Sequence, residues 1–100
     1  MSSLKEDIAA LPEVPGVYFF KDTSGKIIYI GKATSLKKRA QSYFSRFLSA
    51  KTQVMVSKIS SVEYIETPTE PQARLLEASF IREQQPPYNI DLKDDKSFPW

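Results

Sequence analysis

Apolar and polar residues alternate along some stretches of the chain and recur every three or four residues along others. Residues 17–21 and 26–32 are rich in β-branched and aromatic side chains and flank the turn signal DTSG, which predicts a β-hairpin. Residues 61–67, SVEYIET, alternate between apolar and polar positions. This period of two predicts a third strand, so the chain contains the elements of a small sheet.

The clearest helical pattern lies in TEPQARLLEASFIREQQPP, residues 69–87, where the prolines at the end stop the helix. Thr69 and Gln72 have the spacing of a capping box, in which two side chains satisfy backbone N–H groups at a helix start. The last residues, 88–100, show no clear period and are expected to run extended along the surface. Weaker helical patterns cover residues 3–11, 35–48 and 51–60.

The order of glycine and tyrosine in the hairpin predicts which residues its strands bring together. If the hairpin is symmetric about the centre of its turn, Tyr18 lies opposite Tyr29, and Gly16 lies opposite Gly31. Residues directly opposite in an antiparallel pair share a face, so two phenols would lie side by side. The glycines would let another backbone or a ligand approach closely at the open end. An odd-length loop or a bulge would shift this register.

The predicted helix over residues 35–48 would bring basic and aromatic side chains toward the hairpin. Arg39, Tyr43 and Arg46 fall at i, i+4 and i+7, so they share one stripe of that helix. Lys32 lies where the second strand leads toward the same helix. We therefore expect the hairpin tyrosines, this lysine and the stripe to converge.

The composition limits the chemistry that is available. The chain has 100 residues, the size of one ordinary domain, with no cysteine and no histidine. This excludes disulfides, thiolate metal sites and the usual general base, so a metal would need oxygen ligands, as Mg²⁺ or Mn²⁺ does. No stretch approaches the roughly 20 apolar residues of a membrane span, and the first residues lack a signal peptide's apolar run. We expect a cytoplasmic protein without a membrane partner.

Basic residues are concentrated in the middle of the chain. Residues 23–62 contain eight lysines and arginines and no acidic residue, whereas the other sixty contain six basic and 12 acidic residues. This asymmetry indicates either an anionic partner or a solvated basic surface. Lys37 and Lys38 are accordingly either solvated or in contact with phosphates.

One carboxylate falls on an apolar face of the predicted helix over residues 69–87. At about 100° per residue, Glu77 lies between Ala73 and Ile81 on the same arc. A glutamate on a core-facing stripe is unfavourable unless it is paired or holds a cation. The pattern leaves two interpretations open, a salt bridge to Arg74 or Lys32 and a metal ligand. The hairpin tyrosines are open in the same way, because aromatic residues in a hairpin usually pack.

Two tripeptides of the hairpin, GVY at residues 16–18 and YIG at residues 29–31, resemble the defining pattern of the GIY-YIG nucleases. The stretches YIGKATSLKKRAQSYF, LLEASFI and PPYNIDLKDDKSFP occur in the family's order, so the resemblance covers residues 15–99. The ending LKDDKSFP is most similar to the UvrC branch of that family. One departure is Pro87, which stands where Lys or Arg is expected.

The resemblance implies an α/β (α+β) domain, a central three-stranded antiparallel sheet flanked by helices, over residues 1–100. It implies DNA phosphodiester hydrolysis with one Mg²⁺ or Mn²⁺ ion, on the 3′ side of a lesion in nucleotide excision repair. The implied partners are damaged duplex DNA and, through a longer protein, a UvrB–DNA complex, with the isolated domain a monomer. The apolar end at Phe98 and Trp100 suggests a piece cut from such a protein. The alternatives are a stand-alone nuclease of this family and a DNA-binding module without catalysis.

The resemblance also implies roles for residues of the hairpin. Tyr29 would be the general base or would position the attacking water, with Tyr18 as its neighbour. Lys32 would favour the ionised phenol or hold the phosphate. A free tyrosine has a pKa near 10, so we expect nearby Lys⁺ or Arg⁺ to favour its ionised form.

The remaining implied roles belong to the helices that follow. Arg39 would hold the scissile phosphate, with Tyr43 assisting, because arginine suits a bidentate phosphate contact. Glu77 would be the metal ligand, and Asn89 would support the site. The residues expected to contact DNA elsewhere are Lys37, Lys38 and Arg46.

Overall fold

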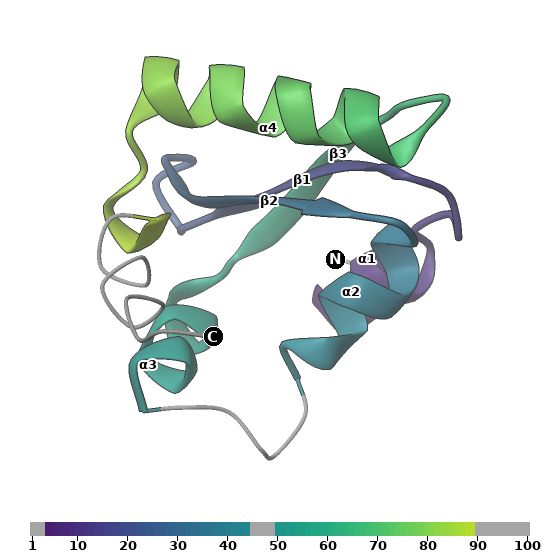
Figure 1. The fold of residues 1–100 in the computed structure, drawn as a ribbon. Helices are drawn as coiled ribbons and strands as arrows, with labels where there is room; N and C mark the ends of the chain where they lie inside the picture. Colours follow the sequence, from purple (N-terminus) through teal and green to yellow (C-terminus); the bar gives the residue numbers. More distant parts are fainter. Residues whose placement is uncertain (1–3, 45–49, 90–100) are drawn as a thin grey trace.

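The computed structural model describes residues 4–44 and 50–89 of the chain (Figure 1). Its elements are, in chain order, α1 (Leu4–Ala9), β1 (Gly16–Lys21), β2 (Ile27–Ala33), α2 (Leu36–Ser42), α3 (Ala50–Lys58), β3 (Ser61–Glu66) and α4 (Glu70–Gln84). The predicted hairpin, third strand and four helices are therefore confirmed, although several bounds differ. The tail predicted to be extended over residues 88–100 begins instead in a helical turn over residues 87–89, where the Asn89 amide donates to Pro86 O at 3.2 Å, and from position 90 onward it lies outside the described residues.

The three strands form one antiparallel sheet in the order β2-β1-β3. Helix α4 covers one face of this sheet, and α1, α2 and α3 lie on the opposite side (Figure 1). Because successive side chains of β1 point to opposite faces, its residues feed two separate cores. Val17 and Phe19 pack toward α4 with Ala73, whereas Tyr18 and Phe20 pack on the other side. This confirms the predicted fold class.

The hairpin register differs from the symmetric one that was predicted. Tyr18 pairs with Gly31 and Phe20 with Tyr29, while Gly16 pairs with Ala33, so neither the tyrosines nor the glycines are direct partners. The five-residue turn, closed by a hydrogen bond from Asp22 N to Lys26 O (3.0 Å), and an irregularity after Phe20 together move the pairing by two residues. An even shift keeps every side chain on its face, so Tyr18 and Tyr29 still lie on the same side of the sheet.

Helix α2 is shorter than the predicted helix over residues 35–48. It begins after Ser35, whose side chain accepts a hydrogen bond from the Lys38 amide at 3.4 Å. It ends at Ser42, because the next amide, of Tyr43, bonds back to Ala40 O at 3.2 Å and tightens the last turn. Arg46, the third member of the predicted stripe, lies outside the described residues.

Helix α4 follows its predicted pattern closely. The Thr69 hydroxyl accepts from the Gln72 amide at 3.4 Å, which is one half of the expected capping box. The helix ends at Gln84, where Gln85 takes a left-handed conformation with φ of 45° ahead of the two prolines. Among the described residues, no helix has the length and apolar character needed to cross a membrane.

Candidate active site

A cavity of about 400 Å³ opens beside the β1–β2 hairpin, between α2 and the first half of α4. It combines phenols, cationic side chains and carboxylates from elements that are far apart in the sequence. Its lining residues are Tyr18, Tyr29, Gly31, Lys32, Ala33, Thr34, Arg39, Glu70 and Glu77. Of the residues predicted to form a reactive site, Tyr18, Tyr29, Lys32, Arg39 and Glu77 are thus brought together.

Three tyrosine hydroxyls form a chain at the buried side of this cavity. The Tyr43 hydroxyl donates to the Tyr29 oxygen at 3.3 Å, and the Tyr18 and Tyr43 oxygens are 2.9 Å apart. Because a phenol has one proton to donate, Tyr18 donates to Tyr43 when Tyr43 donates to Tyr29. The Tyr29 proton then remains available for a group in the cavity. The guanidinium of Arg39 lies 5.4 Å from the centre of the Tyr43 ring, within range of a cation–π contact.

Burial determines how these phenols ionise. The pKa of Tyr29 is raised well above its ordinary value, first by burial and then by the neighbouring Tyr43 oxygen. The pKa of Tyr18 is raised for the same reasons, burial first. Arg39 does lower both pKa values, but its effect is smaller. Arg39 therefore favours the ionised phenols, as expected, but burial outweighs it, so both phenols stay protonated in the protein alone.

The two hairpin glycines make room for other parts of the protein. A Cβ on Gly31 would overlap the hydroxyl and Cζ of the Tyr18 ring, so Gly31 allows that ring to cross the partner strand. A Cβ on Gly16 would overlap the backbone oxygen of Ile65 in β3. At Gly16 the neighbour is the backbone of another strand, as the prediction allowed, whereas at Gly31 it is a buried ring and neither a backbone nor a ligand. Gly16 does not line the cavity.

Two side chains from the C-terminal part of the chain bind the outer edge of β2. The Asn89 side chain pairs with both backbone groups of Ile30, accepting from its N–H at 2.7 Å and donating to its oxygen at 2.8 Å. Two residues further along, the Lys32 N–H donates to Oε2 of Glu77 at 3.0 Å. These bonds satisfy an edge strand that would otherwise be open to pairing. They also hold the Glu77 carboxylate against the cavity wall.

A second carboxylate of the cavity, Glu70, was not predicted from the sequence. Its Oε2 lies 3.3 Å from the Lys32 ammonium and its Oε1 lies 3.6 Å from the Arg74 guanidinium. One of the two interpretations of Glu77 was a salt bridge to Arg74 or Lys32. That salt bridge does not form, because both cations pair with Glu70. The spacing could have indicated this residue, because positions seven apart on a helix lie on the same side.

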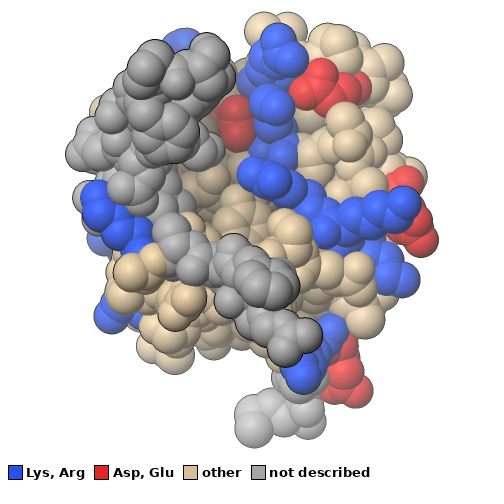
Figure 2. All heavy atoms as spheres, turned by 60° about the horizontal axis from the view of Figure 1, so that its bottom comes forward, with Lys and Arg blue, Asp and Glu red and all other residues tan. Residues whose placement is uncertain are grey.

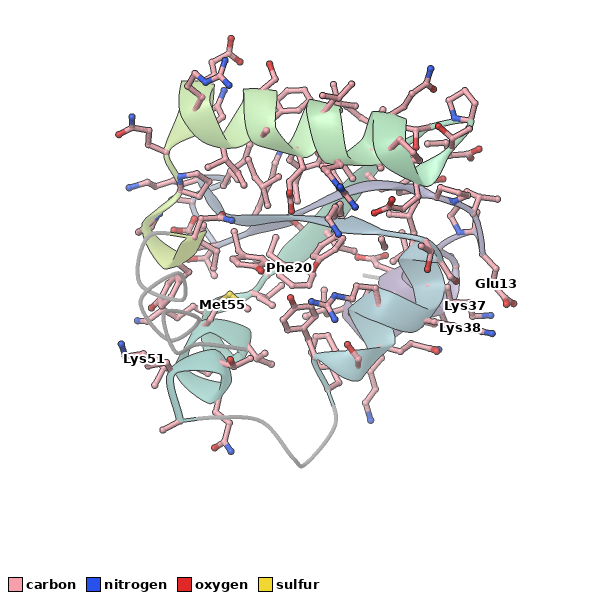
Figure 3. The ribbon with its side chains drawn as sticks, in the orientation of Figure 1. Glu13, Phe20, Lys37, Lys38, Lys51 and Met55 are labelled. Atoms are coloured by element: carbon pink, nitrogen blue, oxygen red, sulfur yellow. The ribbon has the colours of Figure 1, made fainter. Side chains whose placement is uncertain are left out.

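The basic residues of the middle segment lie mainly outside the cavity. Lys37 and Lys38 project from α2 near Glu13, away from the sheet and from the buried Phe20 (Figure 3). Figure 2 shows Lys and Arg side chains forming a band across one face of the molecule, with acidic side chains against it in several places. The predicted contacts of Lys37 and Lys38 with DNA stay predictions, and so does that of Arg46.

Comparison with known proteins agrees with this geometry. Residues 14–90 match the model of the UvrC-like GIY-YIG domain. The chain is 54% identical over 99 residues to the UvrABC system protein C of Methanococcoides burtonii, covering 97% of this chain and 16% of that protein. It is 52% identical over 101 residues to the protein of the same name from Flavobacterium psychrophilum, covering 100% and 17%. The chain thus spans only about a sixth of these relatives.

One solved structure covers nearly the same unit. It is the GIY-YIG N-terminal endonuclease domain of UvrC from Thermotoga maritima, bound to its catalytic divalent cation, magnesium. It superposes with a TM-score of 0.79 at 36% identity and covers 88% of this chain and 98% of that domain. Variants of that domain with a tyrosine changed to phenylalanine were also solved with the cation bound and superpose with TM-scores of 0.78.

Proposed function

The chain belongs to the UvrC-like GIY-YIG domain family, and from this premise we propose that it is an endonuclease domain that hydrolyses DNA phosphodiester bonds with one divalent cation. The observation that carries the proposal is the cavity in which Tyr29, Arg39 and Glu77 face a common space. A general base, a cation that binds phosphate and a carboxylate that binds metal are the parts that such hydrolysis needs. The chain has no histidine, and Tyr29 is the cavity residue that we assign as the base or as the group that positions the water.

The phenol chain supports Tyr29 as the group nearest the attacking water. Its hydroxyl is the last of the chain, so its oxygen accepts from Tyr43 while its own proton points to a further partner. Tyr18 and Tyr43 keep the Tyr29 ring in place through a tilted and a T-shaped contact, with centroids 6.2 and 5.9 Å away. Because burial keeps Tyr29 protonated in the protein alone, it would act on water only when positive charge enters the cavity.

Arg39 and Lys32 are suited to hold the phosphate. Both line the cavity, on opposite sides of the strand-to-helix connection, and an arginine can bind two phosphate oxygens at once. Their positive charge would stabilise the charge that develops on the phosphate during attack. Asn89 would act at a distance, since its two bonds to Ile30 hold the strand that carries Tyr29 and Lys32.

The donor set fits a hard cation that keeps most of its own water. No group of three or more possible metal-ligating side chains occurs in the described part of the chain, which argues against a closed protein cage. Glu77 offers one carboxylate oxygen beyond the one bound to Lys32 N–H, with Glu70 in the same cavity. Mg²⁺ is typically held by one or two carboxylates plus waters, and Mn²⁺ accepts the same ligands. When bound, the cation would supply charge for the phosphate and the leaving oxygen.

The relatives suggest the wider setting of this activity. We propose that the domain makes the 3′-side incision in nucleotide excision repair in the cytoplasm, on damaged duplex DNA. A UvrB–DNA complex would be reached through a longer protein, and the 100-residue domain would itself be monomeric. The band of Lys and Arg side chains in Figure 2 gives the DNA backbone a surface to follow.

The test is incision of a DNA duplex by the chain in Mg²⁺ or Mn²⁺, comparing Glu77→Gln with the parent protein. Glutamine keeps the shape and can still accept from Lys32 N–H, so the variant should stay folded and lose cation-dependent incision. Glu66→Gln, an exposed carboxylate of β3 outside the cavity, is the matched control and should cut normally. A Glu77→Gln protein that cuts at the parent rate would remove Glu77 from the site. Duplex binding without incision by the parent in either metal would instead favour a DNA-binding module.

A further inference from the structure

Lys32 contacts both carboxylates that α4 presents to the cavity, through two different groups. Its backbone N–H donates to Glu77 Oε2 at 3.0 Å, and its ammonium lies 3.3 Å from Glu70 Oε2. The two glutamates are seven positions apart in sequence, which places them about 10 Å apart along one side of the helix. Lys32 therefore contacts α4 at two points two turns apart, with its backbone N–H at Glu77 and its charged ammonium at Glu70.

The Glu77 carboxylate is a second anionic group next to Lys32. A lysine side chain is a flexible four-carbon stem, and the Glu77 carboxylate is bonded to the backbone of the same residue. If the ammonium turned toward Glu77, it would pair with the oxygen that a divalent cation needs. The side chains of Lys32 and Glu70 are only 38% and 26% exposed, so water screens their pair less than one fully on the surface.

We propose that Glu70 is a positioning residue that holds the Lys32 ammonium away from Glu77 and thereby keeps the Glu77 carboxylate open to a divalent cation. This inference rests on the proposed function, in which Glu77 binds that cation. Glu70 also leaves the ammonium on the cavity wall, where a phosphate can meet it. The role is indirect, since Glu70 acts through Lys32.

The chain offers a matched control for this role. Arg74 pairs with the other oxygen of Glu70, Oε1, at 3.6 Å, is 67% exposed and does not line the cavity. Substituting Arg74 removes a partner of Glu70 without freeing the Lys32 ammonium. A change in Mg²⁺ affinity that depends on Glu70 and Lys32 but not on Arg74 would therefore be caused by the Lys32–Glu70 pair inside the cavity.

The experiment is calorimetric titration with Mg²⁺ in 150 mM KCl, where charges more than about 8 Å apart are largely screened. Four proteins form a double-mutant cycle: the parent, Glu70→Gln, Lys32→Met and the double variant. Glu70→Gln should weaken Mg²⁺ binding about fivefold when Lys32 is present and less than about twofold when it is methionine. Lys32→Met alone should not weaken binding. Arg74→Met should bind like the parent, and thermal unfolding of each variant verifies that it is folded.

Two results would overturn the inference. Equal weakening by Glu70→Gln in both backgrounds would mean that Glu70 acts on the cation by its own charge. No weakening in either background would leave Glu70 a purely structural partner of the helix start. A parallel titration of Glu77→Gln separates this from a failure of the proposed function. If the parent and Glu77→Gln bind Mg²⁺ alike, the metal site itself is wrong, whereas loss of binding in Glu77→Gln without coupling in the cycle refutes only the role of Glu70.

Discussion

Substituting Gly31 by alanine should destabilise the protein strongly, although it adds a single methyl group. The new Cβ would overlap the hydroxyl and Cζ of Tyr18 and lie 2.8 Å from its Cε1. The ring cannot move aside easily, because it is fully buried and packs on Phe20 and Tyr43 with centroids 5.1 and 5.9 Å away. Either the two strands separate or the ring leaves its place.

The magnitude follows from the packing and the hydrogen bond that the new methyl group would disturb. Overpacking a well-filled core costs about 1–3 kcal/mol, and breaking the 2.9 Å hydrogen bond between Tyr18 and Tyr43 adds about 1 kcal/mol. A total of about 2–4 kcal/mol should lower the unfolding midpoint by roughly 10–25 °C in a domain of this size. Circular dichroism during heating and urea titration would measure both quantities.

The matched control is Gly25→Ala in the turn. Gly25 has φ of +85° but open space around its missing Cβ, so alanine there carries only the backbone penalty of about 1 kcal/mol. In a Tyr18→Leu background, Gly31→Ala should lose most of its effect, because the ring is gone. Destabilisation by Gly31→Ala no larger than that by Gly25→Ala, or unchanged without the Tyr18 ring, would show that the new Cβ does not clash with that ring.

The remaining predictions concern the phenols and the basic face. Tyr29→Phe should lower incision about 10²–10⁴-fold, as expected for a general base, while the calorimetric Mg²⁺ titration stays near that of the parent; near-normal cutting would rule Tyr29 out. Because burial raises the pKa values of Tyr18 and Tyr29, the unfolded chain loses their protons first above pH 10, and the free energy of unfolding should fall there. Urea titrations between pH 8 and 11 should show a fall of up to about 1.4 kcal/mol per pH unit for each buried phenol, and a smaller one in Tyr29→Phe; identical slopes would mean that Tyr29 ionises freely. Lys37→Ala with Lys38→Ala should weaken duplex binding and flatten its log–log salt dependence by about 0.9 for each phosphate that is no longer neutralised, and an unchanged slope would place the DNA surface elsewhere.

Local signals account for much of what could be predicted. The period of two in the strands, the Thr69 cap and the apolar spacing of α4 depend on residues close in sequence, and each matches an observed element. The end of α2 differs from what its local pattern predicted. Its apolar spacing continues past Ser42, yet Tyr43 closes the helix as its ring enters the phenol cluster. A tertiary contact there outweighs a favourable pattern.

In the candidate site, too, some features were predicted from the sequence and others depend on tertiary contacts. The motif positions predicted that Tyr18, Tyr29, Lys32, Arg39 and Glu77 converge, and these residues line one cavity. The motifs did not predict which groups these side chains contact. Asn89 was expected to support the site, but its two hydrogen bonds to Ile30 on the edge of β2 join residues 59 apart. The sequence did not predict a role for Glu70, because its contact with the Lys32 ammonium depends on the direction of the Lys32 side chain.

The sequence by itself determined which chemistry is possible and which side chains of one strand share a face. Without cysteine or histidine, only phenols, carboxylates and basic side chains were available, and alternation along a strand sends successive side chains to opposite faces. Only the tertiary structure decided the register, which the odd turn and the irregularity after Phe20 moved by two residues. It also decided the ionisation of the phenols, because burial is a property of the packed core and raises pKa values that nearby positive charge alone would lower.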